Sequence, residues 1–139
     1  MANSLTNLGE QYMLMGNLTS SPTDGGMARL AAKLKLFDGV SSVPAKDGTG
    51  FVEVANGNGY VTGGVAITDS DWTFSVVDDV GQIQLDDQIW TASGGTIPNI
   101  GGAYLTDAGD NVLAWWERAT VTLNAADTLT ADDLTVRVS

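Results

Sequence analysis

The stretch AYLTDAGDNVLAWW, residues 103–116, indicates the fold of this chain more directly than any other. Two strand-like blocks, Ala103–Leu105 and Val112–Trp116, flank Asp107–Asn111, whose Asp, Gly and Asn residues are typical of a hairpin turn. Outward from this hairpin, between Gly59 and Asn124, similar short blocks rich in Val, Ile, Thr and Trp are separated by Gly, Asp and Asn. No helical pattern lies between these blocks, so the sequence predicts an all-β fold.

A further strand is predicted near residue 34, where Leu34 and Leu36 alternate with Lys33 and Lys35. Counting such blocks gives roughly eight to ten short strands at spacings near ten residues, which is typical of a sandwich or jelly roll. We therefore expect an antiparallel β-sandwich or jelly-roll-like domain over residues 27–139. Residues 1–26 are expected to form an N-terminal helix and a connector arm.

The N-terminal helix is predicted from the spacing of its apolar residues. Leu5, Leu8, Tyr12 and Met15 recur every three or four positions, which places them on one helical face. Ser4 is positioned to cap the start of this helix. Because the apolar stripe is narrow, we expect the helix to need a surface to lie on, either its own sheet or a partner.

Composition restricts the possible functions. The chain has 139 residues, a formal net charge of -11 from 6 basic and 17 acidic residues, and no cysteine or histidine. This charge repels polyanions, so we expect neither nucleic acid nor an anionic membrane as a partner. Disulfides, thiolate zinc sites and histidine-based catalysis are excluded. The sequence thus predicts a contact protein that is not an enzyme and that uses no metal and no cofactor.

Aspartates recur in pairs, and each pair admits three interpretations. Most pairs adjoin Gly, Asn or Ser between strand blocks, which favours turn residues whose charge stays in water. A calcium site and a glycosidase pair of carboxylates remain the alternatives. The pairs are Asp69 and Asp71, Asp78 and Asp79, Asp86 and Asp87, Asp107 and Asp110, and Asp132 and Asp133.

Two further sets of residues are candidates for binding. Trp115 and Trp116 are adjacent, so in a regular strand they point to opposite faces; packing in the core or an interface is favoured, with glycan stacking as the alternative. Arg29, Lys33 and Lys35 share one strand face, which is either solvated or a docking strip for an acidic protein surface.

Several segments together resemble a known family, the small virion structural proteins of tailed bacteriophages. The segment VTLNAADTLT, residues 121–130, resembles the closing strand motif of that family, and VLAWW, residues 112–116, resembles the strand before it. Other segments agree with the opening helix, the first strand and the central strands: SLTNLGEQY from residue 4, LKLFD from residue 34, IWTA from residue 89 and AYLTD from residue 103.

Members of this family are commonly labelled tail-fibre, head-decoration or uncharacterised virion proteins. Among these roles we expect a capsid decoration, or cement, protein on the exterior of the virion capsid, made in the host cytoplasm. Its expected partners are the major capsid protein and itself, as a homotrimer. The contacts expected from the sequence are the helix residues Leu5, Leu8, Tyr12 and Met15 and the basic residues Arg29, Lys33 and Lys35. A tail-fibre or receptor-binding module that holds glycans is the alternative, and a glycan-degrading enzyme is the third possibility.

Overall fold

The structure is a computed structural model, and it describes residues 4–9 and 31–137. Its elements are strands and one 3-10 turn, apart from a short helical stretch at residues 7–9. In chain order they are β1 (Ser4–Leu5), β2 (Lys33–Asp38), β3 (Val65–Ala66), the 3-10 helix η1 (Asp69–Asp71), β4 (Trp72–Val77), β5 (Val80–Leu85), β6 (Gln88–Thr91), β7 (Ile97–Thr106), β8 (Val112–Leu123), β9 (Thr128–Ala131) and β10 (Leu134–Arg137).

The largest sheet is built around the β7–β8 hairpin. Its strand order is β1-β8-β7-β2-β3, and every neighbouring pair is antiparallel. The hairpin pairs Tyr104 with Trp115 and Leu105 with Ala114 and turns at the predicted Asp107–Asn111 segment. β8 is longer than the predicted block Val112–Trp116, because the strand continues to Leu123.

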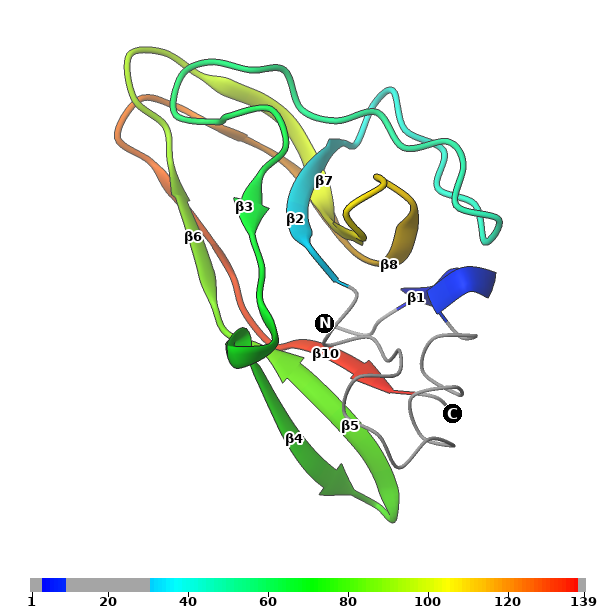
Figure 1. Ribbon diagram of the computed structural model, residues 1–139. Coiled ribbons are helices and arrows are strands. Elements are labelled where there is room, and N and C mark those ends of the chain that lie inside the picture. The colour runs from blue at the N-terminus through cyan, green and yellow to red at the C-terminus, as the bar shows by residue number, and fades with distance from the viewer. Residues whose placement is uncertain (1–3, 10–30, 138–139) are drawn as a thin grey trace.

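Two smaller sheets face this hairpin. β10, β5 and β4 form a three-stranded sheet, and β6 and β9 form a two-stranded one. Figure 1 shows β7 and β8 in the middle of the molecule, the β6–β9 pair along one side and the β4–β5 hairpin at the bottom. The turn of the latter hairpin places Asp78 and Asp79 at φ values of 51° and 61°, as a tight two-residue hairpin turn requires.

The core lies between the large sheet and the smaller ones. Leu36 of β2, Leu105 of β7 and Trp116 of β8 belong to one buried cluster that also contains Leu129 of β9 and Val136 of β10. The indole N–H of Trp116 donates to the Thr135 carbonyl at 3.1 Å, which ties β8 to β10. Burial of side chains from both layers makes the fold sandwich-like.

The predicted fold class is confirmed at the level of an antiparallel all-β domain. A jelly roll has eight strands in two sheets with Greek-key connections. The described strands instead form sheets of five, three and two strands, so the jelly-roll form of the prediction is not confirmed.

The predicted start of the N-terminal helix is wrong. Ser4 does not cap a helix, because Ser4 and Leu5 form β1 and pair with Trp115 and Ala114. The cap is Thr6, whose hydroxyl accepts a hydrogen bond from the Gly9 N–H at 3.0 Å. Ser4 and Leu5 thus belong to the large sheet, and residues 7–9 form a short helical stretch beside it. The rest of the predicted helix, and the boundary at residue 26, lie outside the described residues.

Candidate interaction surfaces

The outer face of the large sheet carries an aromatic cluster. Alternation along the strands places Phe37 of β2, Tyr104 of β7 and Trp115 of β8 on the face opposite the main core. Phe51 packs over them, stacked on Tyr104 with centroids 5.0 Å apart and edge-on to Trp115 at 5.6 Å. Burial raises the pKa of Tyr104 above its usual value. These rings anchor residues 39–54, which we call the cover segment, to the sheet.

The cover segment has a defined conformation of its own. The Asp38 carboxylate accepts hydrogen bonds from the N–H groups of Val40 and Ser41 at 2.8 and 2.9 Å. Farther along, the Val43 N–H donates to the Gly50 carbonyl at 2.8 Å, and the Ser42 hydroxyl accepts from the Val52 N–H at 2.9 Å. Hydrogen bonds therefore hold the two halves of the cover segment together, and Phe51 holds the segment against the sheet.

This ordered segment displays aliphatic side chains to solvent. Val40 is 71% exposed, Val43 78% and Val52 45%. Single exposed apolar residues are normal on a protein surface, and three of them on one hydrogen-bonded segment make that segment a candidate contact surface. These valines were not among the contact residues predicted from the sequence, since they follow no helical or strand periodicity. The available signal was Val40 and Val43 within the Gly-, Ser- and Pro-containing stretch.

Two residues of the predicted basic strip, Lys33 and Lys35, form ion pairs within the described part of the chain. Nζ of Lys33 lies 2.9 Å, and Nζ of Lys35 3.0 Å, from the same carboxylate oxygen of Asp110. These two hydrogen bonds lower the pKa of the Asp110 carboxyl group. The Lys35 side chain is only 9% exposed and lies near the Tyr104 ring. Lys35 thus has no free face for a partner, and Arg29 lies outside the described residues.

The two adjacent tryptophans point to opposite faces, as predicted. Trp116 is fully buried in the main core, and Trp115 is 8% exposed beneath Phe51, with its indole N–H 3.1 Å from a Glu117 carboxylate oxygen. Neither ring presents an open face on which a sugar could stack, because other side chains cover both.

The expected helix contacts are also turned inward where the structure describes them. Leu5 is buried in the main core, and Leu8 packs against it from a partly exposed position. Beside them the Thr6 N–H donates to the Leu113 carbonyl at 2.9 Å, which holds the segment against β8. Tyr12 and Met15 lie outside the described residues.

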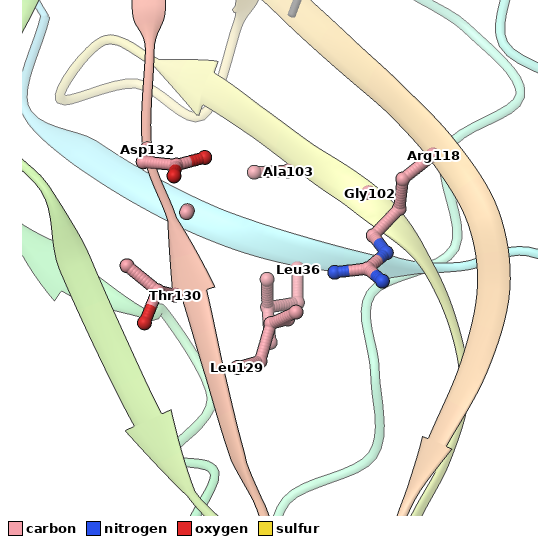
Figure 2. Close-up of a pocket in the computed structure, with 8 residues that line it drawn as sticks. Leu36, Gly102, Ala103, Arg118, Leu129, Thr130 and Asp132 are labelled. Atoms are coloured by element: carbon pink, nitrogen blue, oxygen red, sulfur yellow. The ribbon is translucent and has the colours of Figure 1, made fainter.

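A small cavity opens between β9 and the large sheet (Figure 2). Its volume is about 110 Å³. Figure 2 shows the Arg118 guanidinium reaching from β8 toward Leu36 and Leu129, with Thr130 and Asp132 across from it on the β9 side. The eight lining residues are Leu36, Gly102, Ala103, Arg118, Leu129, Thr130, Ala131 and Asp132. Sequence reasoning did not single out this site, since its walls come from four strands.

The aspartates that the structure describes behave mainly as turn and capping residues. Asp107 accepts from the Gly109 and Asn111 N–H groups at 2.9 and 3.0 Å and so shapes the β7–β8 turn. Asp71 accepts from the Thr68 N–H at 2.8 Å. Within residues 4–9 and 31–137, no three His, Cys, Asp or Glu side chains gather as metal ligands. No helix in the same residues is long and apolar enough to cross a membrane.

Comparison of the chain with protein-family models, with curated proteins and with solved structures finds no match.

Proposed function

We propose that this chain is a bacteriophage capsid decoration, or cement, protein that binds the outside of the shell and joins neighbouring capsid subunits without catalysis. The observation that carries the proposal is the cover segment, a hydrogen-bonded platform that holds Val40, Val43 and Val52 outward. Fixing a segment before binding lowers the entropy cost of association, and apolar side chains on it supply contact area. The resemblance to virion structural proteins supplies the biological setting.

The charge distribution supports an outward-facing location. The net charge of -11 keeps the exposed surface soluble and repels polyanions. In the cover segment, Lys46 and Asp47 lie near the middle and Glu53 adjoins Val52, whereas the residues next to Val40 and Val43 are uncharged. An apolar platform around Val40 and Val43 on an acidic protein is suited to one specific contact, with the rest of the surface left in water.

A binding assay with two matched variants tests the proposal. Purified protein is mixed with shells that lack it, and bound protein is measured by co-sedimentation. We expect the double variant Val40→Ser, Val43→Ser to bind at least about tenfold more weakly, because roughly 1.4 kcal/mol of lost contact corresponds to that factor. Its unfolding should be almost unchanged, since both side chains are exposed.

The control replaces exposed aliphatic residues elsewhere. Val76→Ser, Val77→Ser alters the β4–β5 hairpin, where the two side chains are 61% and 41% exposed. It should bind shells as the unaltered protein does. If the unaltered protein fails to bind shells, or if both double variants bind equally well, the proposal in this form is wrong. Binding to isolated tails alone would favour the tail-fibre alternative.

A further inference from the structure

The two-stranded sheet β6–β9 has an edge beside the cavity that no described strand covers. β9 pairs with β6 and with no other described strand. Leu129–Asp132, four residues in a row, line the cavity. Successive side chains of a strand point to opposite faces, so four consecutive residues line one cavity only where it borders the strand's edge. In Figure 2 that edge is the one turned away from β6.

The backbone groups on this edge are oriented for pairing. The Ala92 N–H donates to the Asp127 carbonyl at 2.9 Å, and Trp90 pairs with Leu129 in the same register. Hydrogen-bonded and non-hydrogen-bonded pairs alternate in an antiparallel ladder. Thr128 and Thr130 therefore turn their N–H and C=O groups away from β6. An added strand would find donors and acceptors there at the regular spacing of a sheet.

The cavity has the size of one side chain. At about 110 Å³ it is smaller than an engineered apolar cavity of about 150 Å³ that admits benzene, and far below the roughly 300 Å³ of small-molecule sites. Its apolar walls include Leu36, Ala103, Leu129 and Ala131. An aliphatic side chain from a strand on the β9 edge would fill this volume.

Arg118 adds a charge requirement at the cavity mouth. Its Nε donates to the Ala119 carbonyl at 3.3 Å, and its guanidinium forms no ion pair with any residue that the structure describes. A guanidinium beside an apolar cavity binds a carboxylate well, because its N–H groups match the two oxygens. Asp132 occupies the opposite wall, so a carboxylate of the occupant belongs on the Arg118 side.

We infer that the free edge of β9 receives an extended segment of the shell protein, which places an aliphatic side chain in the cavity and a neighbouring carboxylate on Arg118. This inference rests on the proposed function and specifies a second contact, separate from the cover segment. The added strand would make β6–β9 a three-stranded sheet, which is more stable than two strands.

Substitutions on the two edges of the same sheet test the strand addition. Thr130→Pro removes an outward N–H from the β9 edge, and Ile89→Pro does so on the opposite edge, because Ile89 pairs with Thr130. We expect Thr130→Pro to weaken co-sedimentation with shells at least about tenfold and Ile89→Pro to leave it within about twofold. Circular dichroism of both variants checks that they fold.

A charge variant provides an independent test, because it does not alter the backbone. Arg118→Glu reverses the exposed charge at the cavity and should also weaken shell binding at least about tenfold. Arg137→Glu makes the same change in net charge at the end of β10 and should weaken it less. Equal binding by the two variants would overturn the role of Arg118.

A single thiol identifies the occupant, since the chain contains no cysteine. Asp132→Cys, carrying a short photoreactive cross-linker, should capture one shell-protein segment with an aliphatic residue next to Asp or Glu. Thr73→Cys, on β4, should not capture it. Capture of a second copy of this chain would overturn the inference. If the unaltered protein binds shells but Thr130→Pro and Arg118→Glu bind equally well, this inference fails while the proposed function stands.

Discussion

Asp110 shares one carboxylate oxygen between Lys33 and Lys35, and its carboxyl pKa is lowered by those two hydrogen bonds. A carboxyl group whose pKa is lower in the folded state stabilises the fold above its unfolded pKa, near 3.9. This stabilisation is lost as the pH falls through the folded pKa. The Asp110 carboxylate also compensates the positive charge of Lys35, whose side chain is almost buried.

We therefore expect Asp110→Asn to be less stable than the unaltered protein at pH 7 and to approach it as the pH falls below about 4. Urea unfolding over a pH series measures this difference, which should also shrink in high salt. Asp79→Asn is the control, because Asp79 occupies a similar turn position and has no lysine contact among the described residues. A stability gap for Asp110→Asn that is unchanged near pH 2 would contradict the account.

Single-residue alternation was sufficient to place several side chains correctly. The strand period of two predicted that Lys35 lies on the opposite face of the sheet from Leu34 and Leu36. The same rule predicted that the adjacent Trp115 and Trp116 lie on opposite faces. What alternation did not reveal is that Phe51 covers Trp115. The segment before Phe51 has no periodicity, and its position depends on packing between rings distant in sequence.

At the scale of elements, the N-terminal segment shows a tertiary contact overriding a local pattern. Leu5 and Leu8 have helical spacing, but Leu5 gains both strand pairing with β8 and burial in the core. A short isolated helix is only marginally stable, so these contacts decide the conformation. In β8, by contrast, the local pattern predicted too short a strand. Its exposed residues 117–120 interrupt the apolar pattern, but pairing with β7 continues the strand.

Removing the N-terminal segment is therefore expected to affect the fold itself. We predict that Leu5→Ala lowers the free energy of unfolding by about 2–3 kcal/mol, because a buried leucine is lost from the core. Asn7→Ala, at an exposed neighbouring position, should change it by less than about 0.5 kcal/mol. Urea denaturation of both variants measures the difference. Equal stability of the two would show that β1 is not part of the core in solution.

At the scale of the whole molecule, the surface combines a high acidic charge with the two proposed contact sites, the cover segment and the β9 edge. Composition predicted the acidic surface and an all-β domain. It did not locate the cavity, because Leu36, Ala103, Arg118 and Leu129 come from four different strands. Both sites lie on backbone that is fixed by hydrogen bonds, which suits a protein that acts by binding many copies of one partner.

Imaging of phage particles purified from infected cells tests the central claim most directly. Averaged shells should show density for this protein on the capsid exterior, with the cover segment against a major capsid subunit. Particles from phage with the gene deleted should lack that density and lose their genome at a lower temperature. Finding the protein only on tails, or absent from particles, would contradict the claim.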